Sequence, residues 1–461
     1  MAEISLGAAA AAPPVPSQRQ VLTAVTASLM GWALDLFDLF MLLYVAPVIG
    51  KLFFPSEHAM LSLAAVYASF AVTLLMRPLG SALFGSYADR KGRKGAMVIA
   101  VMGVGLSTAA FGLLPTVAQV GLLAPALFLA LRLVQGVFVG GVVASTHTIG
   151  TESVALKYRG AVSGLIGGSG AGLGALLASL TYLAMSSIFP GDAFNEWGWR
   201  CMFFTGIISS VLGLVIFSRL DESPLWQQLA AQKAARLAEA RRDAPLEAGA
   251  SPLRTVFTPP HRGVLLTNLL VTIGGGSAYY LTSGYLPTVL KVVTQTPNLV
   301  AAGILMVGSL GVIIASVLAG HLSTLIGRKR AFIVTALIQL GAGPWLYTHL
   351  PGASDHFALG VYVTLLSIVG CIGFAPVLIF LNERFPTAIR ATGTGLSWNI
   401  GFALGGMMPT LVSLVASGPA AIPSTLAWFL AGASALLLIG ALVVPETMGR
   451  LSEAGGGKQP R

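Results

Sequence analysis

The sequence contains few charged residues. Asp, Glu, Lys and Arg make up 10% of its 461 residues, whereas hydrophobic residues make up 55%. An ordinary soluble domain has about 25% charged residues, and apolar runs in this chain repeatedly exceed the ~18 residues that suggest a membrane-spanning helix. The alternating segments of ~10 residues that are typical of an outer-membrane β-barrel are absent. The composition therefore predicts an all-α integral membrane protein and argues against a large soluble one.

Cysteine is also scarce, and the sequence shows no arrangement that is typical of an enzyme. The two cysteines, Cys201 and Cys371, lie in apolar segments without metal-ligand or disulfide spacing. No nucleophile–base pattern is visible, and the glycine-rich runs lie inside apolar segments without the Lys of a phosphate-binding loop. We therefore expect no enzymatic activity, no metal and no cofactor, and an ion gradient as the energy source.

The N-terminus lacks the basic region and short apolar core of a cleaved signal peptide. Residues 1–20 are small, contain proline and are nearly uncharged. We expect them to form a disordered cytoplasmic tail, with the first spanning helix as an uncleaved insertion signal.

Hydropathy predicts twelve spanning helices in two groups of six. A six-helix bundle is expected at 21–218 and a second at 263–445, joined by a charged cytoplasmic linker at 219–262 and followed by a cytoplasmic tail at 446–461. The expected spans are 21–46, 59–84, 95–115, 122–148, 160–187, 199–219, 263–288, 299–320, 331–350, 357–381, 392–416 and 423–445.

The basic residues indicate the orientation of these spans. With both termini in the cytoplasm, 22 of the 27 Lys and Arg residues fall in inward-facing segments. The positive-inside rule favours this orientation over its inverse. The net charge of +10 is then explained by topology and by contact with anionic lipid, and nucleic-acid binding is not expected.

Two motifs occur once in each half of the chain. The segment GSYADRKGRK at 85–94 has a degenerate copy, GHLSTLIGRK, at 320–329, and a Glu-(x6)-Arg motif occurs at 152–159 and again at 383–390. The offsets of 235 and 231 residues place both motifs at the same point of each half. Such parallel repeats are typical of carriers with a central site between two rocking halves.

These motifs resemble those of a known family. GSYADRKGRK is similar to the signature loop of the major facilitator superfamily, and RLVQG at 132–136 is similar to its fourth-helix motif. Other segments resemble the metabolite:proton symporter branch, namely Phe37-Asp38, FFPS at 53–56, RPLG at 77–80, WGWR at 197–200, DESP at 221–224 and RATGTGLS at 390–397. The resemblance implies twelve helices in two pseudo-symmetric bundles and a protein that works by alternating access; we expect a monomer.

The sequence departs from that branch at two positions. Asp35 stands where the branch commonly has Glu, and Val142 stands where it tends to have an acid after the glycine pair of span four. The first change keeps the charge and the second removes a carboxylate, which leaves the proton stoichiometry and the substrate open.

Asp35 and Asp38 are the two acids well inside the predicted spans. A charge at bilayer depth costs about 2.5–3.5 kcal/mol on insertion scales, so it usually faces a cavity or a partner. Their spacing of three places both on one face of the helix, where neighbouring carboxylates favour proton uptake by one of them. We predict proton coupling through this pair; the alternative is a permanently charged Asp–Arg pair that only joins helices.

Arg132 is the predicted substrate-binding residue in span four. A guanidinium in a central cavity binds a carboxylate through two parallel hydrogen bonds, or it releases an Asp when substrate arrives. The alternative is an Arg that satisfies backbone carbonyls of a neighbouring helix. Span seven is rich in Gly, Pro and Tyr, which predicts an interrupted helix. Further substrate contacts are predicted at Tyr280, Tyr279, Trp398 and Asn399, although aromatic residues near span ends also serve as interfacial anchors.

The remaining charged motifs are predicted to form gates. Arg77 is expected to make a gating or structural ion pair, with Asp35 as its candidate partner. The resemblance implies a conformational latch at the signature loop, and Thr324 replaces its acid in the second copy. The alternative is that these charges only set the topology. The predicted gating residues are Gly85, Asp89, Arg90, Gly92, Arg93, Lys94, Glu152, Arg159, Gly327, Arg328, Glu383 and Arg390.

The glycines of span five predict a close helix contact. Gly164, Gly167, Gly168, Gly170, Gly172 and Gly174 lie in this span, and small residues let helix backbones approach and slide.

The sequence therefore predicts a carrier of the bacterial inner membrane that imports a small organic acid or zwitterion with protons. Its expected partners are this substrate, protons and membrane lipid. An uncoupled facilitator or exporter on the same fold remains an alternative, and a non-transporting membrane sensor is a more remote one. The sequence does not identify the substrate.

Overall fold

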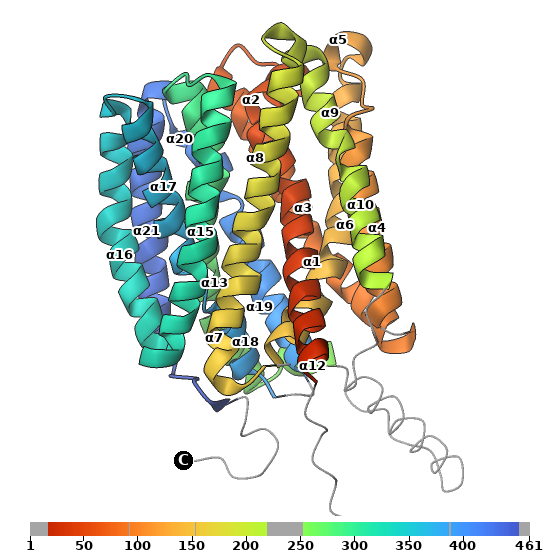
Figure 1. Ribbon diagram of the computed structural model, residues 1–461, viewed down its shortest axis with the longest axis vertical. Helices are drawn as coiled ribbons and strands as arrows, with labels where there is room; N and C mark the ends of the chain where they lie inside the picture. The colour runs from red at the N-terminus through yellow and green to blue at the C-terminus, as the bar shows by residue number, and fades with distance from the viewer. Residues whose placement is uncertain (1–16, 92, 153, 219–251, 387–388, 451–461) are drawn as a thin grey trace, which may run out of the picture.

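The computed structural model describes residues 17–91, 93–152, 154–218, 252–386 and 389–450, apart from the side chains of 85–86, 88–94, 143–149, 152, 217–218, 252 and 391. The described residues are almost entirely helical (Figure 1). Helices satisfy their backbone polar groups internally, which a segment inside a lipid bilayer requires. The all-α architecture predicted from the composition is confirmed.

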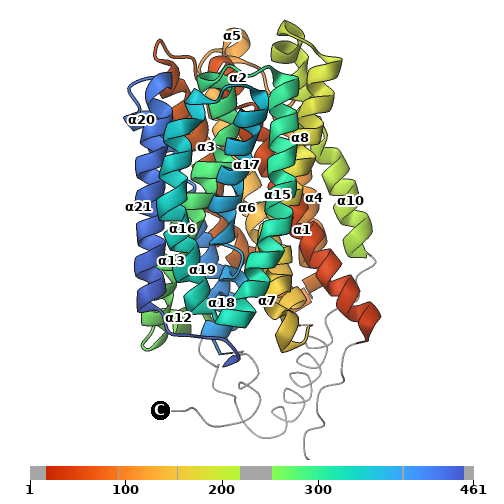
Figure 2. The ribbon, with the colours of Figure 1, turned by 60° about the vertical axis from the view of Figure 1, so that its left-hand side comes forward.

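The described helices account for the twelve predicted spans. Eleven segments are long and apolar enough to cross a membrane, and Gly95–Phe111 is a shorter apolar helix at the position of the third span. The described ends of the chain, in α1 and after α21, lie at the same end of the molecule (Figures 1 and 2). This agrees with an even number of spans.

The first six spans form one bundle, coloured red to yellow-green in Figure 1. Its elements are α1 (Gln18–Tyr44), α2 (Ala46–Phe53), α3 (Ala59–Lys91), α4 (Arg93–Phe111), α5 (Val117–Val120), α6 (Leu123–Glu152), α7 (Leu156–Gly164), η1 (Leu165–Ser169), α8 (Gly170–Ile188), η2 (Phe194–Gly198), α9 (Trp199–Phe204) and α10 (Gly206–Ser218).

The last six spans form the second bundle, coloured green to blue. Its elements are α12 (Pro252–Val256), α13 (His261–Tyr279), η3 (Tyr280–Gly284), α14 (Leu286–Thr288), η4 (Val289–Val293), α15 (Asn298–Ile326), α16 (Arg328–His349), η5 (Leu350–Gly352), α17 (His356–Ile372), α18 (Val377–Arg384), α19 (Arg390–Gly405), α20 (Met408–Val415), η6 (Pro419–Ala421) and α21 (Ile422–Val443).

Three segments outside the spans differ from the expectations or lie beyond the described residues. The signature segment 85–94, expected as a loop, is helical on both sides of position 92, because α3 runs to Lys91 and α4 begins at Arg93. The expected tail 1–20 ends in helix, since α1 begins at Gln18 behind a capping box at Ser17. Most of the expected linker and C-terminal tail lies outside the described residues.

Span seven is interrupted, as its Gly, Pro and Tyr content predicts. α13 passes into the π-helical turn η3 at Tyr280, and Pro287 stands in the first turn of α14. Proline suits a helix start because its missing N–H has no intrahelical acceptor there. Tyr279, Tyr280 and Tyr285 flank the interruption, and all three are buried.

The two bundles meet along α7–η1–α8 and α15, which run side by side (Figures 1 and 2). A Cβ atom added at Gly164 would collide with the Ser316 carbonyl oxygen, and one added at Gly160 would collide with the Gly320 carbonyl oxygen. Side chains at these positions would force the backbones apart. The close approach predicted from the glycines of span five is therefore present, and it lies on the boundary between the bundles.

Candidate functional site

Asp35 of α1 and Arg77 of α3 form a buried ion pair. Asp35 Oδ2 lies 3.4 Å from Arg77 Nη2, and both side chains are fully buried. The guanidinium also lies 5.8 Å from the centre of the Trp32 ring. Asp35 Oδ1 and Arg77 Nε and Nη1 have no hydrogen-bond partner among the described residues. Arg77 therefore has the ion-pair partner that the sequence suggested, and each side chain keeps hydrogen-bonding capacity that is not used.

Asp38 lies one turn further along α1 but in a different environment. Its Oδ2 accepts a hydrogen bond of 2.7 Å from Ser209 Oγ of α10, and the Thr108 side chain of α4 lies beside it. Within the described part of the chain, Asp38 forms no ion pair. The two carboxylates on one helix therefore differ in kind, because one faces a cation and the other faces hydroxyl groups.

Arg132 lies inside the first bundle, between α4 and α6. Its Nη1 donates to Gln135 Oε1 at 2.7 Å, and its guanidinium lies 4.2 Å from the centre of the Phe111 ring. Gln135 in turn donates to Thr108 Oγ1 at 2.8 Å. Gln135 and Thr108 thus form a polar chain from Arg132 towards Asp38. Arg132 does not line the cavity described next, so its predicted contact with substrate stays a prediction.

A small cavity lies between the two bundles. Residues of both bundles line it, including Phe40, Tyr44 and Gly172 from the first and Tyr279, Ser309 and Ser367 from the second. The volume of the cavity is about 20 Å³, which is enough for about one water molecule. The Tyr279 hydroxyl is buried without a hydrogen-bond partner in the described residues. In this conformation the cavity is too narrow for a metabolite.

Aromatic rings surround the region between this cavity and the Asp35–Arg77 pair. We call them the aromatic belt. Their ring centres lie 4.5–6.2 Å apart in a continuous series that crosses from one bundle to the other. The members are Trp32, Phe40, Phe70, Tyr279, Tyr280, Phe374, Trp398 and Phe402.

The belt brings together three of the predicted substrate contacts and leaves the fourth at its edge. Tyr280 packs against Phe70 of α3 with ring centres 5.5 Å apart, and Tyr279 and Trp398 stack on neighbouring rings. Asn399 follows Trp398 on α19 and donates to Ser81 Oγ at 3.0 Å, so it joins the bundles instead of pointing at the cavity.

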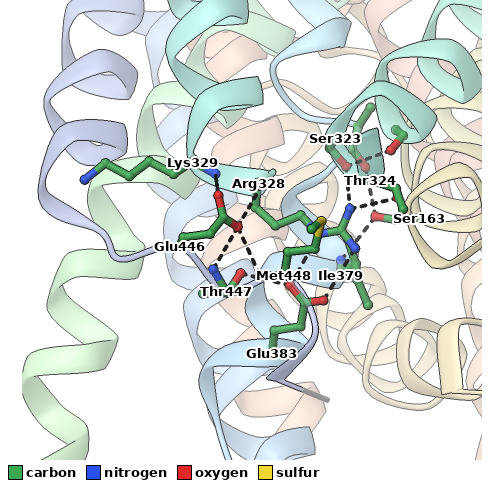
Figure 3. Close-up of polar contacts among 12 residues, drawn as sticks. Ser163, Ser323, Thr324, Arg328, Lys329, Ile379, Glu383, Glu446, Thr447 and Met448 are labelled. Carbon is green, nitrogen blue, oxygen red and sulfur yellow. Dashed lines mark hydrogen bonds and ion pairs between the residues drawn. The ribbon is translucent and has the colours of Figure 1, made fainter. Parts of the chain in front are cut away.

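At one end of the molecule, α15 ends and α16 begins with Arg328, Lys329 and Arg330; we call this the basic end. Arg328 Nε lies 3.3 Å from Glu383 Oε2 of α18, and both side chains are fully buried. Arg328 Nη1 also donates to Ser323 Oγ at 2.7 Å and to Thr324 Oγ1 at 3.0 Å (Figure 3). Two of the predicted gating residues are therefore paired directly.

The bundles also contact each other across the basic end. Ser163 Oγ of α7 donates to the Ala375 carbonyl at 2.9 Å and accepts from the Ile379 amide at 3.1 Å. Asn382 Nδ2 of α18 donates to Thr151 Oγ1 of α6 at 3.1 Å. These bonds join the first bundle to the helix that carries Glu383.

At the opposite end, which we call the far end, a tyrosine pair joins the bundles. The rings of Tyr67 and Tyr285 stack with centres 4.9 Å apart and an angle of 14° between their planes. The Tyr67 hydroxyl also lies 2.8 Å from Thr288 Oγ1, and the Tyr285 hydroxyl lies 2.7 Å from Ser413 Oγ. The cavity is therefore closed by contacts between the bundles on both sides.

Residues 28–410 match the family model described as Major Facilitator Superfamily. The chain belongs to the major facilitator superfamily. It is 27% identical to the inner membrane metabolite transport protein YhjE of Escherichia coli (strain K12) over 94% of this chain and 96% of that one. It is 28% identical to the proline/betaine transporter of Salmonella typhimurium (strain LT2) over 85% and 77% of the two chains. The same identity, over 86% and 87%, relates it to the alpha-ketoglutarate permease of Escherichia coli (strain K12).

The fold is that of solved superfamily members. The structure of the proton:xylose symporter XylE bound to 6-bromo-6-deoxy-D-glucose superposes with a TM-score of 0.70 at 20% identity, over 95% of this chain and 99% of that one. Membership of the superfamily establishes a multi-pass membrane transporter, and it agrees with the absence of enzymatic motifs from the sequence.

The two superfamily repeats are described to different extents. Gly92 and the side chains of Asp89, Arg90, Arg93, Lys94 and Glu152 lie outside the described residues, so the predicted roles of these residues and of Gly85 as gates stay predictions. Arg159 and Arg390 are equivalent in the two halves, and each donates from Nε to the carbonyl oxygen five residues earlier, that of Val154 and of Phe385, at 3.3 Å. The repeat that the sequence predicts is thus present in side-chain contacts.

Two residues of the basic end were not predicted from the sequence. Glu446 accepts from the backbone amides of Arg328 and Lys329 at 2.9 and 3.1 Å, and Thr447 Oγ1 donates to Glu383 Oε2 at 2.9 Å. Gly327, with a φ of 97°, turns the chain in front of α16. One signal was available, because the first turn of α16 has no acidic residue of its own and Glu446 is the first acid after the last span.

Burial raises the pKa of Glu446, but hydrogen bonds from the amides of Met448, Arg328, Thr447 and Lys329 outweigh this and hold it below its usual value. The carboxylate is therefore charged at neutral pH, where it caps the positive end of the helix dipole of α16.

Proposed function

We propose that this transporter imports a small organic acid or zwitterion together with protons by alternating access. The observation that carries the proposal is the pair of carboxylates on α1. Asp35 is paired with Arg77, and Asp38 is held by a hydroxyl group without a cation. Different environments for two neighbouring acids allow them to take different roles.

Asp38 is the proton carrier in this proposal. A charged carboxylate at membrane depth without a cation costs about 2.5–3.5 kcal/mol on insertion scales, whereas the neutral acid needs only hydrogen bonds. Ser209 accommodates both forms, because a hydroxyl group donates to a carboxylate and accepts from a protonated acid. Hydrogen bonds from Arg132 to Gln135 and from Gln135 to Thr108 connect a buried cation to the surroundings of Asp38. The charge of Asp38 therefore affects Arg132 electrostatically.

Substrate binds between the bundles, in an enlarged form of the cavity beside Tyr279 and the aromatic belt. Arg77 is its carboxylate partner, because its guanidinium lies beside the aromatic belt, 5.8 Å from the Trp32 ring, and has two nitrogens without partners in the described residues for parallel hydrogen bonds with a carboxylate. Arg132, which the sequence suggested for this role, acts on the proton site instead.

The contacts at the two ends serve as the gates. Tyr67 with Tyr285 and Thr288 closes the far end, and Ser163 and Asn382 close the basic end beside the Arg328–Glu383 pair of the second bundle. We place the basic end and both termini in the cytoplasm, because the predicted inward-facing segments hold most of the Lys and Arg residues. We also propose that the membrane is a bacterial inner membrane. The name of one relative specifies this membrane for that protein.

The test is uptake by purified protein in liposomes. The panel contains succinate, 2-oxoglutarate, L-proline and glycine betaine, each with an inward proton gradient imposed or abolished by a protonophore. We expect accumulation of at least one compound above its external concentration, at least ~10-fold greater with the gradient than without it. Equal uptake in both conditions indicates a facilitator and overturns the coupling, and the absence of flux overturns transport of these compounds.

A further inference from the structure

We infer that the substrate is a zwitterion with an N-methylated ammonium group, whose carboxylate binds Arg77 and whose cationic head lies against the aromatic belt. This inference rests on the proposed function, because it specifies the substrate of the same central site. It is carried by three observations: the charge balance of the site, the rings around it and the buried polar atoms that have no partner among the described residues.

The charge balance favours a ligand with no net charge. Asp35 and Arg77 neutralise each other, and both are fully buried. The described residues that line the cavity are aromatic, aliphatic or hydroxyl-bearing, and none of them is charged. A dicarboxylate would bring two negative charges to a site with one guanidinium that is already paired. Removing charges from water without partners costs several kcal/mol per ion, so this site disfavours net anions.

The aromatic belt provides a surface for a cation. Trp32 and Phe70 come from the first bundle, and Tyr280, Trp398 and Phe402 come from the second. Ring faces attract cations most strongly where water is excluded, and methylated ammonium groups are recognised in this way. The rings meet mostly edge-to-face in the closed conformation, so that a small outward movement of one bundle exposes faces from both sides to one ligand.

The ion pair borders this belt. Trp32 precedes Asp35 by one turn of α1, and Phe70 precedes Arg77 by two turns of α3, so each ring lies on the same helix face as its charged residue. Arg77 lies 5.8 Å from the Trp32 ring, so the guanidinium lies beside the belt. A ligand with charges a few ångströms apart therefore reaches Arg77 and the rings together.

The unpartnered atoms complete the match. Asp35 Oδ1, Arg77 Nε and Nη1 and the Tyr279 hydroxyl are buried without hydrogen bonds to described residues, which is uncommon in folded proteins. A zwitterion matches groups of both signs: its carboxylate accepts hydrogen bonds from Arg77 and Tyr279, and its ammonium group, which has no N–H to donate, balances the charge of Asp35 electrostatically. A simple monocarboxylate satisfies only the donors and leaves Asp35 without a counter-charge.

Three probes of the purified protein separate these ligand classes. Glycine betaine and 3,3-dimethylbutyrate have nearly the same shape, but the quaternary nitrogen of the first is a carbon in the second. Succinate represents dicarboxylates. In calorimetric titrations at one pH, we expect 3,3-dimethylbutyrate and succinate to bind at least ~10-fold more weakly than glycine betaine, as expected for a desolvated cation–ring contact. Equal or tighter binding of either probe overturns the inference.

A tryptophan substitution tests the belt itself. Trp398→Leu removes a ring of the belt, and Trp428→Leu removes a tryptophan that is 79% exposed on α21 and serves as the matched control. We expect Trp398→Leu to weaken glycine betaine binding ~5-fold or more and to change 3,3-dimethylbutyrate binding less than ~2-fold, with no change in the control. Equal weakening of both probes shows that the ring supports only packing. If Trp398→Leu does not fold, the comparison of probes on the unaltered protein still decides.

The liposome assay distinguishes failure of this inference from failure of the proposed function. If the proton gradient drives uptake of succinate but not of glycine betaine, the proposal of a proton-coupled transporter stands and the inference of a zwitterionic substrate is wrong. If uptake of glycine betaine is equal with and without the proton gradient, the inference of a zwitterionic substrate stands and the proposed proton coupling is wrong.

Discussion

At the scale of single residues, the most informative feature is the contrast between Asp35 and Asp38. Their spacing predicts a shared helix face, and by that criterion the two acids are interchangeable. The structure distinguishes them by their partners, since Arg77 neutralises one and Ser209 hydrogen-bonds the other. In the proposed function the proton therefore binds Asp38, the carboxylate that has no cation among the described residues.

Asp38→Asn is expected to separate substrate binding from coupling. The amide keeps a hydrogen bond with Ser209 but does not titrate. Counterflow of substrate between equal concentrations should continue at a similar rate, while gradient-driven accumulation should fall at least ~10-fold; both are measured in liposomes.

The control is Asp192→Asn, which neutralises an exposed acid between α8 and η2 and should transport like the unaltered protein. Undiminished proton-driven accumulation in Asp38→Asn would remove this residue from the coupling.

At the scale of the elements, helix contacts explain why certain small and capping residues occur where they do. α7 and α15 touch through backbone atoms, with Gly160 and Gly164 on one side and Ser316 and Gly320 on the other. Contacts of this kind join helices closely without interlocking large side chains. They therefore suit a boundary between bundles that must open. The ion pair of Arg328 with Glu383 is different, because both residues belong to the second bundle and the pair need not break when the bundles separate.

Gly164→Ala is expected to destabilise this boundary. The new methyl group would meet the Ser316 carbonyl oxygen, which belongs to backbone that cannot rotate away. Overpacking costs about 1–3 kcal/mol, which should lower the apparent melting temperature in detergent.

Gly303→Ala is the matched control, because a Cβ atom there meets nothing within 4 Å and alanine favours helix by about 1 kcal/mol over glycine. A melting temperature for Gly164→Ala equal to that of the control would show that the two helices separate without cost.

Glu446→Gln is expected to weaken the cap of α16. Loss of an N-terminal cap typically costs about 1 kcal/mol. Because the pKa of Glu446 is lowered by folding, its charge contributes stability above the ordinary glutamate pKa of about 4.3, and this contribution is lost as the pH falls through the lower folded value.

Thermal unfolding should therefore show a constant deficit for Glu446→Gln between pH 5 and pH 8, on the order of 1 kcal/mol, that shrinks below about pH 4. A deficit that grows on acidification would contradict this role. Glu196→Gln, on an exposed acid of η2, is the control.

At the scale of the whole molecule, the two bundles touch at both ends and enclose a cavity that is too small for substrate. Alternating access then requires that one set of contacts break while the other persists. The contacts at the far end include the tyrosine stack and the hydrogen bond of Tyr67, and those at the basic end include hydrogen bonds from Ser163 and Asn382. The balance between these two sets determines which side the cavity faces.

Tyr67→Phe is expected to shift the molecule towards opening at the far end. The substitution removes the hydrogen bond to Thr288 and keeps the ring stack. A hydrogen bond contributes about 0.5–1.5 kcal/mol, so the open population should rise ~2- to 10-fold.

The measurement is the rate at which an impermeant thiol reagent labels Ser309→Cys from the far end, in a protein whose two native cysteines are replaced. Tyr362→Phe, on a partly buried tyrosine of α17, is the control. Unchanged labelling in Tyr67→Phe would show that this hydrogen bond does not hold the far end closed.

The sequence by itself determined the class of the protein, the number of spans, the duplication and the interrupted seventh helix. Each of these depends on local composition or on a motif repeated at a constant offset. It also indicated Asp35, Asp38 and Arg77, because a charged residue in the middle of a long apolar segment can be recognised from the sequence alone.

Only the tertiary structure decided which of these groups meet. It paired Asp35 with Arg77, placed Arg132 on Phe111 and Gln135 within one bundle, and brought Glu446 from beyond the last span to the start of α16. Apart from Gln135, which lies three residues from Arg132 on α6, these partners lie on different elements, tens to more than a hundred residues apart along the chain. Their contacts depend on how the helices pack and rotate against each other, and the pattern along one helix does not contain that information.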